Sequence, residues 1–121
     1  MNSANEINKL NFIHRKASDA ISYCQGQKPQ DFTDDRLFSG ATQMCFVFIS
    51  NACKALSPEV REGNPQVNWL AMAKRGDALI EKYWDVDFDD LWRAVHHELP
   101  PFIKRIEAIT SSLETEYGPK N

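Results

Sequence analysis

The sequence predicts an all-α protein: an antiparallel, up-and-down bundle of four main helices in a single domain spanning residues 1–121. Three observations predict it. The chain has 121 residues, it contains only five glycines and six prolines, and its apolar residues recur at steps of three and four. This length suits one domain with one core. The scarcity of turn residues leaves little room for the many chain reversals that an all-β fold needs.

The first helix is expected over residues 4–25. Its apolar residues fall at helical spacing. They are Ile7, Leu10, Ile13, Ala17, Ala20, Ile21 and Cys24. Gly26 and Pro29 then end the segment. The run "DFTDD" offers Thr33 or Asp34 as the residue that caps the start of the next helix.

The second helix, expected over residues 34–56, carries no charge between Arg36 and Lys54. Its expected core stripe is Leu37, Ala41, Met44, Phe48, Ala52 and Leu56. A different face holds Ser39, Gln43 and Ser50, with Phe46 among them. That face could be solvated, but solvated helix faces usually carry Lys or Glu. The missing charges therefore favour self-association through this face.

The third and fourth helices are expected over residues 68–83 and 87–116. The apolar stripe of the third is Trp69, Met72, Ala73, Gly76, Leu79, Ile80 and Tyr83. The stripe of the fourth is Phe88, Leu91, Val95, Leu99, Phe102, Ile106, Ile109 and Leu113. This second stripe keeps its phase across Pro100 and Pro101, which should break helical hydrogen bonds. A kinked helix, or two abutting helices on one axis, satisfies both facts.

The charge and the cysteine content limit the classes of function that this chain could have. The net charge of −3 gives no overall basic field, so any RNA contact would depend on a local patch of Lys and Arg. The three cysteines, Cys24, Cys45 and Cys53, sit in helix-forming apolar sequence, where buried reduced thiols are expected. No Cys and His residues cluster at zinc-ligand spacing, so we expect neither metal nor cofactor. Without a signal peptide or an apolar span, the expected location is the cytoplasm, with no membrane contact.

Spaced motifs across the middle of the chain carry a resemblance to a known family. They are "DFTDDRLFSGATQMCFVFISNACKALSPEVREGNPQVNW", then "YWDVDFDDLW", then "ELP". Together they resemble the HepT-like family of HEPN proteins, over about residues 10 to 110. The resemblance implies an all-α bundle that forms a homodimer. It also implies metal-independent RNA cleavage by a toxin, which a nucleotidyltransferase-type antitoxin encoded beside it restrains.

The family's catalytic motif is an arginine, four to six residues, a histidine, any residue and a tyrosine. On this sequence the tyrosine is Tyr83, and Glu81 stands at the histidine position. Gly76 falls at the expected arginine position, with Arg75 directly before it and still inside the permitted window. A metal-free ribonuclease needs proton transfer and stabilisation of a charged phosphorane. Glu81 could act as a base, but it would repel phosphate and offers no acid.

Two further departures affect the expected cleft. Asp77, one turn before Glu81, adds a second negative charge that opposes RNA docking. The family commonly has an "I-G-E-A" tetrad in the second helix, where this chain has "ISNA" at residues 49–52. Ser50 and Asn51 remain polar and could line the cleft, but a negative charge is missing there.

Other side chains allow two interpretations each. Adjacent His96 and His97 point about a hundred degrees apart on a helix, so they cannot share a metal ion. Structural or solvent-facing roles are expected, and the alternative is a relocated acid–base group beside Arg75 or Arg93. His14 is expected in a solvated charge cluster. Tyr83 could be a packed ring at the edge of the core or, as the resemblance implies, an acceptor for nucleotide transfer by the partner.

The functional expectation is a HepT-like protein whose own ribonuclease activity is weak or absent, so its status as an enzyme stays open. One alternative is a rearranged site in which Arg75 turns into the cleft and His96 or His97 supplies the proton. Another is a non-catalytic helical adaptor, or a nucleotide-acceptor subunit for a nucleotidyltransferase.

Overall fold

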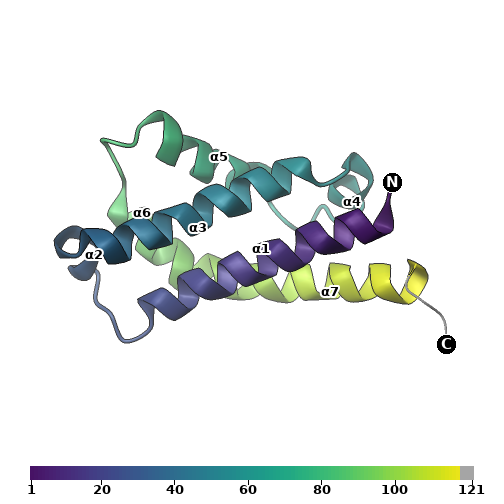
Figure 1. The fold of residues 1–121 in the computed structure, drawn as a ribbon, viewed down its shortest axis with the longest axis horizontal. Helices are drawn as coiled ribbons and strands as arrows, with labels where there is room; N and C mark the ends of the chain where they lie inside the picture. The colour runs from purple at the N-terminus through teal and green to yellow at the C-terminus, as the bar shows by residue number, and fades with distance from the viewer. Residues whose placement is uncertain (118–121) are drawn as a thin grey trace.

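The computed structural model describes residues 1–117, and in that part of the chain every regular element is helical, as the sequence predicts. The elements are α1 (Ser3–Cys24), α2 (Asp31–Asp34), α3 (Arg36–Ala55), α4 (Pro58–Glu62), α5 (Trp69–Glu81), α6 (Phe88–Arg93), the π-helical segment η1 (Ala94–Glu98) and α7 (Leu99–Tyr117). Figure 1 shows α1, α3 and α7 along the long axis, with α5 beside α3. The all-α bundle is therefore confirmed.

The start of α3 differs from expectation by one short helical turn. Thr33 and Asp34 belong to α2, whose Phe32 is buried in the core. The capping residue is Asp35, whose extended backbone lets its carboxylate accept hydrogen bonds from the amides of Leu37 and Phe38. The chemistry of the cap was predicted correctly, but its position was not.

The core face of α3 is largely the reverse of the predicted one, although Leu56 at its end is buried as predicted and Ala52 is partly buried. Leu37 is 86% exposed, and Met44 and Phe48 are exposed too. The residues that turn inward are instead Ser39, Thr42, Cys45, Phe46, Val47, Ile49, Ser50 and Cys53. The prediction was wrong because it assigned small polar residues to a surface. In the structure they let neighbouring helices approach closely, and Thr42 bonds back to the carbonyl of Phe38 at 3.0 Å.

The two prolines do not split the last helix. Pro100 and Pro101 lie in the first turn of α7, which follows η1 and α6 without a break. The amide of Leu99 bonds to the carbonyl of Ala94, five residues earlier, so the chain takes on a wider π-helical turn just before the prolines. That turn accommodates residues without amide hydrogens and keeps one continuous apolar stripe.

Gly76 sets the closest approach of α5 to α3. A Cβ atom at this position would overlap the Cβ of Ser50, and would lie 2.7 Å from the Ser50 Oγ and 2.9 Å from the Phe46 carbonyl oxygen. The Ser50 hydroxyl donates a hydrogen bond of 2.7 Å to the carbonyl of Ala73, one turn earlier on α5. A serine, an alanine and a glycine therefore lock the two helices together at short range.

We predict that Gly76→Ala lowers the free energy of unfolding by about 1–3 kcal/mol, because the added methyl group forces α3 and α5 apart. Gly40→Ala is the matched control, since a Cβ at Gly40 meets no atom within 4 Å. In a helix interior this control should gain about 0.5–1 kcal/mol. Urea denaturation of both variants measures the difference. Equal stability of Gly76→Ala and the wild type would contradict the close crossing.

Candidate functional site

Arg75 is held inside the bundle by two carboxylates from the last helical segment. Its Nε donates to Asp90 Oδ2 at 3.1 Å, and its Nη2 donates to Glu98 Oε2 at 2.8 Å. The side chain is only 14% exposed, and its guanidinium lies over the ring of Phe46 at 5.8 Å. The remaining nitrogen, Nη1, is buried and has no partner among the described residues. This arginine does not present its charge to solvent.

The electrostatics of Asp90 agree with this arrangement. Burial raises the pKa of the Asp90 carboxyl, but the hydrogen bonds and charges of Arg75 and Arg93 outweigh burial and hold the pKa below its ordinary value. Arg93 bonds to the other carboxylate oxygen at 2.8 Å. Asp90 is therefore an ionised anchor at neutral pH, and it ties α5 to α6.

Sequence reasoning missed Asp90 and Glu98 as partners of Arg75. They lie fifteen and twenty-three residues further along the chain, so no local pattern links them to Arg75. One signal was available: they are eight residues apart on one continuous helical segment, which places them near the same face. Two partly buried acids on one side of a helix make a nearby cationic partner favourable.

Gly76, the expected arginine position, points into the α3–α5 contact instead of a cleft. A large side chain at this position would have to occupy the space of Ser50. An arginine therefore cannot be restored there without separating the two helices. The only arginine that this stretch of α5 provides is Arg75.

Glu81 and Tyr83 lie at the exposed end of α5. Glu81 is the last residue of the helix, and Tyr83 follows in the turn. Tyr83 is 73% exposed, and its ring meets that of Trp84 edge-on at 5.1 Å. The interpretation of Tyr83 as a ring packed at the edge of the core was wrong, because α5 ends two residues before it and the chain turns outward.

The three residues expected to line the cleft lie in different environments. Ser50 is 1% exposed, at the crossing with α5. Asn51 lies on the exposed outer side of α3. Asp77 is partly buried and pairs with Lys54 of α3 at 2.5 Å. This pair offsets the negative charge of Asp77, and it was not foreseen.

Each of the three histidines either contacts another residue or is exposed to solvent. The His96 ring stacks on Trp92 at 4.3 Å, and its Nδ1 lies 2.8 Å from the Trp92 carbonyl oxygen. His97 is exposed. His14 lies 2.9 Å from Glu107 of α7, so it bridges two helices instead of joining a local charge cluster. Glu98, and neither His96 nor His97, forms the contact with Arg75.

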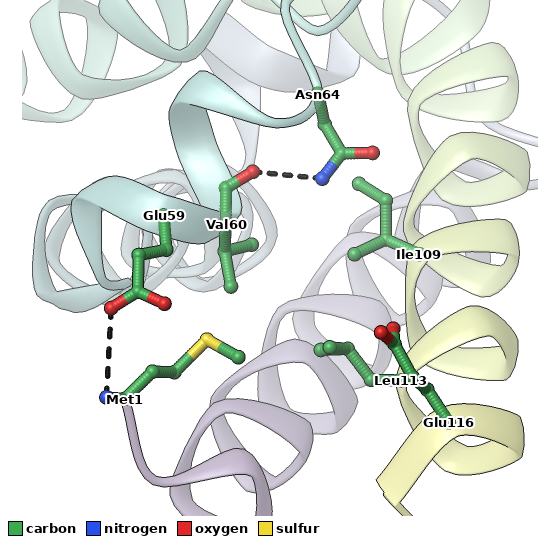
Figure 2. Close-up of a pocket in the computed structure, with 7 residues that line it drawn as sticks. All are labelled: Met1, Glu59, Val60, Asn64, Ile109, Leu113 and Glu116. Carbon is green, nitrogen blue, oxygen red and sulfur yellow. Dashed lines mark hydrogen bonds and ion pairs between the residues drawn. The ribbon is translucent and has the colours of Figure 1, made fainter.

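One hollow, drawn in Figure 2, is lined by residues at the end of the bundle where Figure 1 shows the N-terminus, α4 and the end of α7. Its volume is about 240 Å³, and it lies between the start of α1, α4 and the end of α7. Figure 2 shows Glu59 facing the terminal amine of Met1, which lies 3.5 Å away. No residue of the motif region lines this hollow. No helix within the described part of the chain is long and apolar enough to cross a bilayer.

Chemically, the motif positions provide one buried arginine and one exposed glutamate. Arg75 pairs with two carboxylates, and Glu81 faces solvent, with Asp85, Asp87 and Asp89 following it in the sequence. A phosphate group that approached Glu81 would meet negative charge, and no free guanidinium is supplied by α5. In this single chain, the arrangement of the charged residues at the motif positions favours a role in helix packing over a role in RNA binding.

Comparisons with known proteins identify relatives. The family model described as Ribonuclease HepT-like matches residues 13–109. A protein of Methanocaldococcus jannaschii named "Putative RNase" is 30% identical over 104 residues, which cover 86% of each chain. Another from the same organism, with the same description, is 26% identical over 96 residues, 79% of each chain. A "Probable ribonuclease HepT" from Thermococcus cleftensis is 28% identical over 80 residues, covering 66% of this chain and 73% of that one. No solved structure matches this chain significantly.

Proposed function

Because the chain belongs to the HepT-like ribonuclease family, we propose that it is the HepT-like member of a toxin–antitoxin pair and that its own ribonuclease activity is weak or lost. One observation carries the second half of this proposal. Arg75, the only arginine that α5 offers to the motif, is 14% exposed and engaged by Asp90 and Glu98.

The chemistry of RNA cleavage explains why that observation matters. Without a metal ion, cleavage needs a base for the ribose 2′-hydroxyl, an acid for the leaving oxygen, and cationic donors for the phosphorane. Histidine can perform either proton transfer near neutral pH, whereas a solvent-exposed carboxylate provides only a weak base. Glu81 is exposed at the end of α5, so the motif offers a carboxylate at the position where the family has an imidazole.

The outer face of α3 supports a homodimer. This face is exposed and uncharged, and it consists of Leu37, Ala41, Met44, Phe48, Asn51 and Ala55. Exposed apolar patches of this kind commonly mark protein–protein contacts. Ile80 and Tyr83 at the end of α5 are exposed large side chains too. The self-association expected of α3 is therefore proposed for this face, and not for the buried face with Ser39 and Ser50.

The exposure of Tyr83 also favours a role toward a nucleotidyltransferase-like antitoxin. Its hydroxyl belongs to a ring that is 73% exposed, so an enzyme could reach it as a nucleotide acceptor. An adaptor or acceptor subunit needs an accessible tyrosine but no catalytic histidine. Both proteins of such a pair would act in the cytoplasm. A neighbouring gene without a nucleotidyltransferase motif would count against this pairing.

The test of activity is cleavage of labelled RNA by the purified protein, beside a HepT relative with an intact motif. We predict wild-type cleavage lower by on the order of a hundred- to ten-thousandfold, the usual cost of losing a positioned acid–base group. Glu81→His should raise cleavage, because it removes a repelling charge and adds a group that titrates near neutral pH. Glu81→Gln, the matched control, removes only the charge and should gain less.

Vigorous wild-type cleavage that Glu81→Gln or Arg75→Ala abolishes in a folded protein would overturn this proposal. Glu81 would then be a working catalytic base. Gly76→Arg is unsuitable for restoring the motif, because the new side chain would displace Ser50.

For the assembly, we predict that the wild type sediments as a dimer at micromolar concentration and that Leu37→Glu or Met44→Lys converts it to a monomer. Both side chains are exposed in the single chain, so a charge there opposes association without disturbing the core. Asn8→Glu, on the exposed side of α1, is the control and should remain dimeric. A monomeric wild type would refute the dimer.

A further inference from the structure

A second, larger pocket lies on the side of α5 that faces α4, away from the turn with Tyr83. Its volume is about 570 Å³, within the range typical of small-molecule sites. It is lined by Cys53, Lys54, Arg61, Glu62, Trp69, Leu70, Ala73, Lys74 and Asp77. These residues come from the end of α3, from α4 and from α5 between Trp69 and Asp77.

The pocket has a fixed aromatic wall. The Trp69 indole N–H donates to the carbonyl oxygens of Arg61 and Asn64, each at 3.1 Å. The Phe102 ring packs edge-on against the indole with the centroids 6.5 Å apart. The ring is thus held in place before any ligand arrives. Leu70, which is 64% exposed, extends this apolar wall toward solvent without contributing to the core.

The charges of the pocket differ in sign from those of the whole chain. Its three cations and two carboxylates leave an excess of one positive charge, whereas the chain carries −3. Lys54 is paired with Asp77. Among the described residues, no carboxylate forms an ion pair with Lys74 or Arg61.

The two unpaired cations remain available to a ligand. The Arg61 Nε donates to the carbonyl oxygen of Leu56 at 3.2 Å, which orients the guanidinium, and within residues 1–117 its two terminal nitrogens have no hydrogen-bond partner in the protein. Lys74 is exposed on α5, one helical turn after Leu70. An aromatic wall beside an oriented guanidinium and an ammonium suits a molecule with a flat ring and a phosphate.

We infer that this pocket binds a nucleotide, with the base against Trp69 and Leu70 and the phosphate between Arg61 and Lys74. The same chemistry describes a free mononucleotide and a terminal nucleotide of an RNA strand. An apolar ligand would leave the two cations unused, and inorganic phosphate would leave the aromatic wall unused. The inference goes beyond the proposed function and does not depend on it, since the pocket contains none of Arg75, Glu81 and Tyr83, and Asp77 is its one residue that was also expected to line the cleft.

The test is isothermal titration calorimetry on the full chain with AMP, UMP, adenosine, inorganic phosphate and a short 5′-phosphorylated oligoribonucleotide. AMP or UMP should bind with a dissociation constant on the order of 0.1–1 mM, and adenosine and phosphate at least about tenfold more weakly. Lys74→Glu and Leu70→Asp change exposed side chains and should each weaken binding by about tenfold or more. Lys82→Glu, also exposed but outside the pocket, is the matched control and should bind as the wild type does.

The 5′-phosphorylated oligoribonucleotide distinguishes a free nucleotide from the end of an RNA strand. An oligoribonucleotide that binds more tightly than AMP, and that AMP displaces, identifies a strand terminus as the occupant. Mononucleotide binding without that gain identifies a free nucleotide. The inference is overturned if neither form binds at millimolar concentration, if phosphate alone binds as tightly, or if Lys74→Glu and Leu70→Asp bind like Lys82→Glu. None of these outcomes depends on whether the protein cleaves RNA.

Discussion

The contact between Gly76 and Ser50 is the constraint on which the rest of the site depends. It brings the backbones of α3 and α5 so close that α5 has one allowed rotation about its axis. The residue before the glycine, Arg75, then points into the bundle, where Asp90 and Glu98 meet it. Residues on the opposite side of α5 face outward, which places Leu70 and Lys74 at a pocket and Glu81 in solvent.

The rotation of α5 about its axis places a buried, paired arginine and an exposed lysine on different sides of the helix. The Arg75 guanidinium, which could otherwise bind a phosphate, already pairs with two carboxylates in a mostly buried position. An ion pair there gains from the low dielectric constant, but burying its charges costs desolvation energy. The two cations that form no ion pair among the described residues are Lys74 on the outward side of α5 and Arg61 on α4. The inferred nucleotide site would therefore depend on Arg61 and Lys74 and not on Arg75. Lys74 and Arg75 are neighbours in the sequence, but Lys74 lines the pocket while Arg75 faces the bundle interior.

Much of the fold could be predicted because helical periodicity is a local property. The four main helices follow from apolar steps of three and four, and α7 continues past Pro100 and Pro101 as its stripe indicated. The inward face of α3 could not be derived in the same way. Small polar residues such as Ser50 turn inward beside Phe46 and Ile49. Because Leu37, Met44 and Phe48 face out, large apolar residues lie on both sides of α3, and hydrophobicity alone does not identify the core side.

The residue types at the motif positions could be predicted from the sequence, but their contacts and burial could not. The positions of Gly76, Glu81 and Tyr83 in the motif come directly from spacing. The burial of Arg75 depends on Asp90 and Glu98, which only the tertiary structure brings near. The Lys54–Asp77 pair likewise joins residues twenty-three positions apart on different helices. The exposure of Tyr83 depends on where α5 ends, and helix ends are the least predictable feature of a sequence.

A double-mutant cycle between Arg75 and Asp90 tests most directly whether this arginine is a structural element. Arg75→Gln, Asp90→Asn and the double variant would be compared with the wild type by urea denaturation. A coupling energy of about 1 kcal/mol or more is predicted for this partly buried pair. The same cycle on Lys54 and Asp77, whose side chains are more exposed, should give less than about 0.5 kcal/mol. If the Arg75–Asp90 coupling is no larger than that of the exposed pair, the guanidinium is free to turn outward, and the account of a silenced catalytic motif is wrong.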